Sequence, residues 1–294
     1  MTTTTVSVPD QSTIRSALTV ERLLYGCFLL AGVFLRFNQL GLQPLTPAEA
    51  AQSWPLWQAA QGLPAETAAP ASASALLASL QYALFWLTQG GDVSARLPAA
   101  LAGTALLLVP WFLRPWLGRA TALVLALLFA IDPWLVAFSR VAGGAMLSTA
   151  LALFCLACMA RLAMPVSGQE TNRGWLYGAT VSAGLLLVSG PLAWSYGAVL
   201  LLFALLVVGP ALTPAARTTL RTQTVTVALV FGLAAALAAT LWLARLEGMA
   251  AVSRGLGVWA AQFQAGPYSF AWSIARVLVD QALLLLFAIV GLFM

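Results

Sequence analysis

The sequence contains no histidine and no lysine, and only 8% of its 294 residues are charged. A soluble domain normally carries about 25% charged residues, so a water-exposed globule of this length is excluded. A disordered chain is excluded as well, because 61% of the residues are hydrophobic. Without histidine the chain lacks the commonest general base and metal ligand. Any chemistry must therefore depend on carboxylates, arginine, tyrosine or serine.

Cysteine is scarce too, and Cys27, Cys155 and Cys158 all lie inside apolar runs. The spacing Cys155-x-x-Cys158 occurs in zinc sites. A thiolate pair within apolar sequence and without histidine is nevertheless a poor metal site. We interpret these cysteines as small packing residues and predict no metal ligands.

Long apolar runs dominate what is present, and the mean hydropathy is +0.91. A membrane-spanning helix needs about 20 mainly apolar residues. The pattern predicts an all-α, polytopic transmembrane bundle of about eight spans. The predicted spans cover residues 23–37, 97–113, 120–134, 146–163, 175–188, 192–208, 225–243 and 273–292.

The arginines decide the predicted topology, because positive residues favour the cytoplasmic side of a membrane. If residues 76–87 lie flat on the membrane, eight of the 14 arginines fall in cytoplasmic connections or in the N-terminal tail. We therefore predict a disordered cytoplasmic tail at residues 1–20 and a membrane module at residues 21–294. Residues 38–95 then form an extracytoplasmic loop with surface helices at 48–61 and 74–88. The arginines stand singly, which argues against a nucleic-acid partner.

Glu49 is the first candidate for chemistry, and its sequence context allows two interpretations. Thr46, Pro47 and Glu49 have the spacing of a helix-capping box with proline at the first helical position. Burial near lipid would instead raise the pKa of the carboxyl group, which could then act as a general base on an acceptor hydroxyl. The residue pattern by itself favours the capping box.

Arg96 and Arg140 lie at the predicted outer ends of spans. Each could hold a phosphate with its forked, permanently charged group, or extend to the membrane interface as an ordinary end residue. Asp132 and Asp280 lie within apolar sequence, where an acid needs a partner or a role. For Asp280 the simpler interpretation is an ion pair with Arg276 one turn earlier on the same helix.

Six segments follow one another along the chain in a recognisable order. They read LRFNQL at 35–40, LTPAEAAQ at 45–52, WQAAQG at 57–62, ARLPAALAG at 95–103, LGRA at 117–120 and DPWLVAFSR at 132–140, and Tyr268 and Asp280 come after them. Taken together, these segments resemble the GT-C superfamily of polyprenyl-phosphate-sugar-dependent glycosyltransferases. The similarity is to the bacterial relatives of protein O-mannosyltransferases and of the lipid A aminoarabinose transferase.

The resemblance implies a transferase of the bacterial inner membrane. Glu49 would be the catalytic base, while Arg96, Arg140, Tyr268 and Asp280 would bind substrate. The donor would be a sugar on a polyprenyl-phosphate carrier within the membrane lipid, and participation of a divalent metal stays open.

The chain departs from the family pattern in the second loop, where an acid commonly follows the Ser-Arg pair. Here the sequence after Ser139 and Arg140 is VAGGAM, without an acid. The alternative hypothesis is therefore a catalytically inactive subunit with the same fold in a larger membrane complex. A transporter is disfavoured, because the sequence has no internal repeat and no paired broken spans.

Overall fold

The computed structural model describes residues 19–63, 74–164, 173–212, 214–240 and 249–262. Every regular element in these ranges is a helix, which confirms the all-α prediction. The elements are α2 (Val20–Phe37), α3 (Pro47–Ala60), α4 (Ala75–Thr88), α5 (Asp92–Leu106), α6 (Val109–Leu117), α7 (Arg119–Ile131), α8 (Pro133–Ser139), α9 (Gly144–Ala163), α10 (Arg173–Leu187), α11 (Leu192–Phe203), the π-helix η1 (Ala204–Val208), α12 (Gly209–Ala211), α13 (Pro214–Thr222), α14 (Thr224–Ala239) and α15 (Met249–Ala261). The predicted tail at 1–20 and the predicted last span at 273–292 fall largely or wholly outside the described residues.

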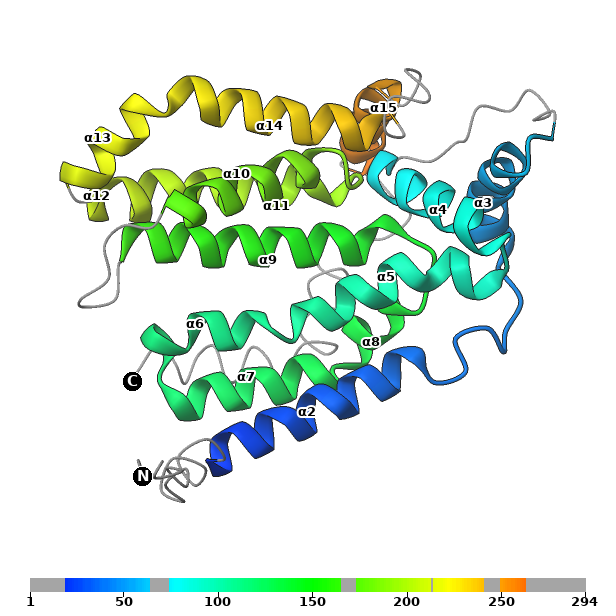
Figure 1. Cartoon of the computed structure of the whole chain (residues 1–294), viewed down its shortest axis with the longest axis horizontal. Coiled ribbons are helices and arrows are strands. Elements are labelled where there is room, and N and C mark those ends of the chain that lie inside the picture. Colours follow the sequence, from blue (N-terminus) through cyan, green and yellow to red (C-terminus); the bar gives the residue numbers. More distant parts are fainter. Residues whose placement is uncertain (1–18, 64–73, 165–172, 213, 241–248, 263–294) are drawn as a thin grey trace, which may run out of the picture.

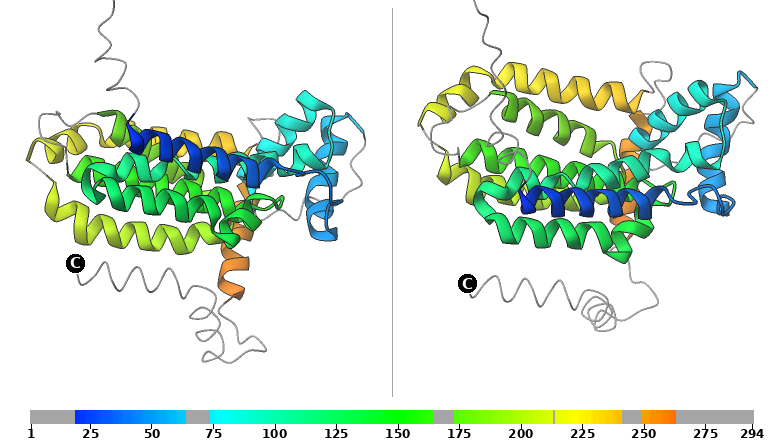
Figure 2. Two further views of the ribbon diagram at one scale, coloured as in Figure 1. Left: turned by 90° about the horizontal axis from the view of Figure 1, so that it is seen from below. Right: turned by 60° about the horizontal axis from the view of Figure 1, so that its bottom comes forward.

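The long helices run roughly along one axis, and their connections gather at two opposite ends (Figure 1). One end carries α3, α4, α8 and α15 and is called the outer end below, after the predicted topology. The opposite, inner end carries the turn between α6 and α7 and helix α13 (Figure 2). Helices occupy both segments predicted as surface helices, 48–61 and 74–88, as α3 and α4, which pack against each other.

Three helical segments of the described chain are long and apolar enough to cross a membrane. They are Asp92–Leu117, Gly144–Ala163 and Leu192–Ala211. The pair Arg119–Ile131 and Pro133–Ser139 makes a fourth if it counts as one span. By length and composition these segments are those of a multi-pass membrane protein. The larger number of about eight spans is not confirmed.

The predicted span at 120–134 is broken by a bend of 54° between α7 and α8. The break follows from the Asp132-Pro133 pair, because the residue before a proline avoids the helical conformation. Asp132 has ψ 121°, and its carboxylate caps the next helix by accepting a hydrogen bond from the Leu135 amide at 2.8 Å. Asp132, the acid predicted to need a partner because it lies in apolar sequence, thus has one in the Leu135 amide at the start of α8.

Small residues allow the helices to pack closely, as is typical of membrane bundles. A Cβ atom at Gly184 of α10 would lie only 2.7 Å from the Phe231 carbonyl oxygen of α14. Cys155 and Cys158 are fully buried in an apolar cluster with Ala152 and Ala179, as the packing interpretation predicts. Large apolar side chains are instead exposed along the outer faces of α2, α11 and α14, where a membrane would cover them.

The arrangement of α3 and α4 gives a direct test of topology. Leu42 precedes α3, Val93 follows α4, and their side chains are 71% and 48% exposed. If neither helix crosses the membrane, single cysteines at these two positions will react with an impermeant maleimide from outside intact cells. The background variant is Cys27→Ala, since Cys155 and Cys158 are buried. A cysteine at Ala120, at the inner end, serves as the control that reacts only after permeabilisation. Labelling of position 93 from inside alone would show that α4 crosses.

Candidate functional site

The start of α3 at the outer end has the predicted capping box. The Thr46 hydroxyl accepts a hydrogen bond from the Glu49 amide at 3.3 Å, and Glu49 Oε2 accepts one from the Thr46 amide at 2.9 Å. Pro47 occupies the first turn, where its missing N–H costs nothing. Both predicted features of this helix start are therefore confirmed.

The Glu49 side chain is not exposed at the membrane surface but buried, with 3% relative exposure. Its partner is Arg96 of α5, which is 6% exposed. Arg96 Nε donates to Glu49 Oε1 and Arg96 Nη2 to Glu49 Oε2, both at 3.0 Å. This parallel, two-point geometry is the strong form of an arginine–carboxylate contact. The backbone amide of Ala142, in the turn between α8 and α9, also donates to Oε1 at 2.7 Å.

Glu49 therefore has no acceptor position left over. A carboxylate offers about four lone-pair sites, and here Oε1 serves Arg96 and Ala142 while Oε2 serves Arg96 and Thr46. We call the group of Thr46, Glu49, Arg96 and Ala142 the Glu49 clasp. It ties the first loop to α5 and to the turn before α9.

The N–H donors of Arg96 are also all occupied. Its remaining N–H groups donate to three backbone carbonyls of the segment that joins α2 to α3. Nη1 contacts Leu40 at 3.0 Å and Gln43 at 2.8 Å, and Nη2 contacts Pro44 at 3.1 Å. With the two bonds to Glu49, all five guanidinium donors are used. In this conformation Arg96 cannot contact a phosphate without giving up a bond.

The pKa of Glu49 corrects the sequence-based expectation. Burial raises this pKa, as expected, but the hydrogen bonds from Arg96, Ala142 and Thr46 outweigh that effect and lower the pKa to about 2. Desolvation near lipid alone would raise the pKa of Glu49. In the structure, however, the buried carboxylate contacts the Arg96 cation and the amides of Ala142 and Thr46, which stabilise its charge. The carboxylate is ionised at neutral pH and is a weak proton acceptor while the clasp is closed.

Arg140, the other predicted phosphate ligand, contacts the end of α2 and the start of the same connecting segment. Nη1 donates to the carbonyls of Leu35 at 2.8 Å and Asn38 at 2.9 Å, and Nη2 to that of Gln39 at 3.5 Å. Arg140 is only partly buried. Three bonds leave two of its five N–H donors unused among the described residues. Arg140, and not Arg96, is thus the arginine that can accept an anion without rearrangement.

Sequence analysis missed Arg36, which is completely buried. It donates to the carbonyls of Phe129 at 2.7 Å and Ala130 at 3.3 Å, near the C-terminus of α7. A cation at the negative end of a helix is favourable, so Arg36 joins α2 to α7. In the sequence, Arg36 stands out as a charged residue at the end of an apolar run. The run does not show which helix provides the carbonyl groups that accept its hydrogen bonds.

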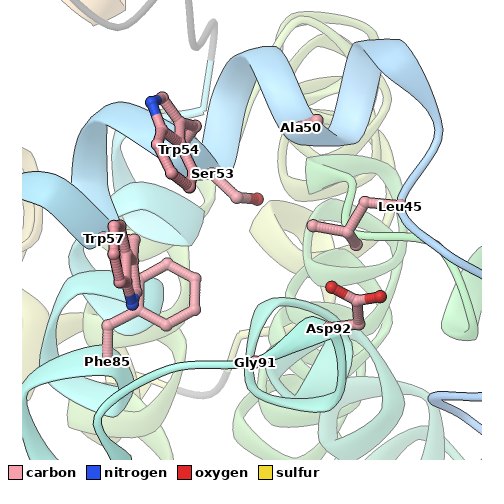
Figure 3. Close-up of a pocket in the computed structure, with 8 residues that line it drawn as sticks. All are labelled: Leu45, Ala50, Ser53, Trp54, Trp57, Phe85, Gly91 and Asp92. Carbon is pink, nitrogen blue, oxygen red and sulfur yellow. The ribbon is translucent and has the colours of Figure 1, made fainter.

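A second feature missed from the sequence is a small pocket of about 210 Å³ next to the Glu49 clasp. Figure 3 shows Trp54, Trp57 and Phe85 on one side of the pocket and Asp92 on the other, with the Asp92 carboxylate and the Ser53 hydroxyl directed toward the space between them. Trp54 and Trp57 are stacked, with ring centroids 4.8 Å apart. Asp92 follows the pair Gly90-Gly91 and reads as an ordinary helix-start acid, so nothing in the sequence linked it to the tryptophans.

A larger apolar groove, of about 790 Å³, lies between α4, α5, α9, α10 and α14. Ser79 is the one polar residue among those that line it, and its hydroxyl is already bonded to the Ala238 carbonyl. The lining includes Leu87 of α4 and Pro98 of α5, both near the outer end. The groove can therefore accommodate a hydrocarbon chain but offers nothing to a polar ligand.

Two predicted substrate-binding residues, Tyr268 and Asp280, lie outside the described residues. Within the described ranges no group of three or more cysteine, aspartate or glutamate side chains comes together to hold a metal ion. Comparisons with family models, with curated proteins and with solved structures find no match.

Proposed function

We propose that this protein is a membrane glycosyltransferase that moves a sugar from a polyprenyl-phosphate carrier to an acceptor on the outer face of a bacterial inner membrane. In this proposal the chain crosses the membrane about eight times, and both termini lie in the cytoplasm. The apolar groove is the observation that supports it best, because its lining suits an isoprenoid chain.

The carrier's chain would fill the groove, and its phosphate would lie at the outer end. Burial of each CH₂ group contributes about 0.8 kcal/mol, so a groove of about 790 Å³ offers enough contact to hold a long chain. Arg140 would bind the phosphate through its two unused N–H groups. A permanently charged guanidinium compensates the charge that develops on the leaving phosphate.

The reaction would be a single displacement with Glu49 as base. The acceptor oxygen forms a bond to the anomeric carbon while the bond from that carbon to the carrier phosphate breaks. The acceptor proton passes to Glu49, and the phosphate leaves with the electron pair, so the configuration at the sugar carbon inverts. Because Glu49 is saturated, Arg96 and the Ala142 amide must first release it, and substrate binding would have to supply that rearrangement.

Filling the groove tests the proposal. Ala105 lines the groove and is exposed, so Ala105→Trp should fit without disturbing the core. The expected result is at least a hundredfold lower affinity for a photoreactive polyprenyl phosphate and an equal loss of transfer from a labelled polyprenyl-phosphate sugar. Exclusion of about four CH₂ groups accounts for this loss, since it costs about 3 kcal/mol.

The matched control is Ala228→Trp. Ala228 is exposed on α14 and does not line the groove, so labelling and transfer should match those of the wild type. Equal photolabelling of wild type and Ala105→Trp would remove the groove as the carrier site and with it the main support for the proposal.

The second candidate function is a catalytically inactive subunit of a larger membrane complex. The closed Glu49 clasp favours it, because a carboxylate with every acceptor position filled has a complete structural role. Purification from native membranes separates the candidates. A stoichiometric complex whose isolated subunit shows no transfer supports the subunit, and turnover by the isolated protein supports the enzyme.

A further inference from the structure

We propose that the small pocket formed by Trp54, Trp57, Phe85 and Asp92 binds an alkylammonium group, either the head group of a zwitterionic lipid or the cationic end of a soluble amine. The site is distinct from the groove and from the Glu49 clasp. The inference does not depend on the transferase proposal.

The charge of the pocket is the first argument. Asp92 lines it, and within the described residues its carboxylate makes no hydrogen bond or ion pair. Arg96, one turn further along α5, is paired with Glu49 by two hydrogen bonds and acts on Asp92 only through space. The pocket thus retains one negative charge that a monovalent cation can balance.

The aromatic walls are the second argument. The faces of tryptophan and phenylalanine rings attract cations through their negative π-surface, and tryptophan does so best. The Trp57 indole N–H is held by the Gln89 carbonyl at 3.2 Å, which fixes that ring. The stacked pair Trp54 and Trp57 and the opposing Asp92 therefore surround one small space with groups that stabilise positive charge (Figure 3).

A neutral sugar is the main competing occupant, and the lining disfavours it. A sugar brings several hydroxyl groups, and each buried hydroxyl needs a partner. Apart from the tryptophan N–H groups, of which that of Trp57 already bonds Gln89, Ser53 and Asp92 supply the polar side-chain groups of the pocket lining. An alkylammonium group needs only a counter-charge and ring faces. The pocket volume of about 210 Å³ is also below the roughly 300–1,000 Å³ of sites for drug-sized ligands, so the occupant is small.

The test uses the purified full-length protein in nanodiscs of pure phosphatidylglycerol, with ligand-observed NMR of choline. Choline should bind, and its uncharged carbon analogue 3,3-dimethylbutan-1-ol should bind at least about tenfold more weakly. Asp92→Asn should weaken choline binding by about tenfold or more, as expected for loss of a charge-assisted contact. Trp54→Leu should also weaken it. The matched control is Asp132→Asn, which removes a helix-capping carboxylate that is not among the residues lining this pocket.

Nanodiscs that contain phosphatidylethanolamine identify the source of the cation. A weaker apparent choline affinity in them shows that the lipid head group occupies the pocket, and an unchanged affinity points to a soluble amine. The proposal is overturned if choline and its uncharged analogue bind equally, if Asp92→Asn leaves binding intact, or if glucose binds in place of choline. Helical circular dichroism of each variant separates lost binding from lost folding.

Discussion

Glu49→Gln is expected to lower the free energy of unfolding by about 3–5 kcal/mol, the usual cost of removing one member of a buried ion pair. The change leaves the Arg96 cation buried without its counter-charge. It also turns one acceptor oxygen into an NH₂ donor that faces N–H donors of Arg96, Thr46 or Ala142. Unfolding in mixed SDS micelles, followed by far-UV circular dichroism, measures the loss.

The control for this result is a double-mutant cycle with Arg96→Met. The double variant no longer contains the buried cation. Its loss of unfolding free energy should therefore be smaller than the sum of the losses of the two single variants, by about 0.5–3 kcal/mol. Asp132→Asn provides a second control. That carboxylate caps α8 and acts on the buried Arg36 cation only through space, and asparagine caps a helix nearly as well as aspartate, so Asp132→Asn should cost less than Glu49→Gln. Strict additivity of Glu49→Gln and Arg96→Met would show that the two side chains do not stabilise each other.

Acidification should destabilise the wild type more than the Glu49→Gln variant. The pKa of Glu49 lies at about 2 in the folded protein, against an ordinary value of 4.5. A lowered pKa contributes stability above the unfolded value and loses it as the pH falls toward the folded value. The contribution is therefore complete above about pH 5, is lost between about pH 5 and pH 2, and amounts to about 3 kcal/mol.

The measurement is the unfolding free energy of wild type and Glu49→Gln at pH 6, 4 and 3. The difference between them should shrink steadily as the pH falls. A difference that stays constant across this range would mean that the Glu49 carboxyl group titrates with the same pKa in the folded and unfolded protein, and the hydrogen bonds of the clasp could not then be stabilising its charge.

Local signals in the sequence predict much of the fold. Apolar runs of span length give the positions of α9, α10, α11 and α14, because a helix is the natural way for such a run to satisfy its backbone in lipid. The capping box at Thr46 and Glu49 follows from four consecutive residues. The end of α7 was missed, because the predicted span at 120–134 ran through Asp132 although Pro133 limits the conformation of that residue.

The site could not be predicted in the same way, because its contacts join distant segments. Glu49 and Arg96 are 47 residues apart, and no spacing rule brings α3 against α5. The sequence led to the prediction of Glu49 as a catalytic base or capping residue and of Arg96 as a phosphate ligand, without placing the two in contact. Asp92 was not singled out from the sequence at all. Charge, burial and neighbours of a side chain depend on packing, which a pattern along one helix does not contain.

The Glu49 clasp also has a consequence for biogenesis. Glu49 leaves the ribosome 47 residues before Arg96 and 93 residues before Ala142. Until Arg96 and Ala142 have been synthesised and have reached the outer end, only water and the Thr46 amide at the start of α3 can stabilise the Glu49 carboxylate. The first loop, although synthesised early, can thus reach its final shape only after the helices that carry its later partners have entered the bilayer. The order of synthesis and the order of structural completion are therefore opposite at this end of the molecule.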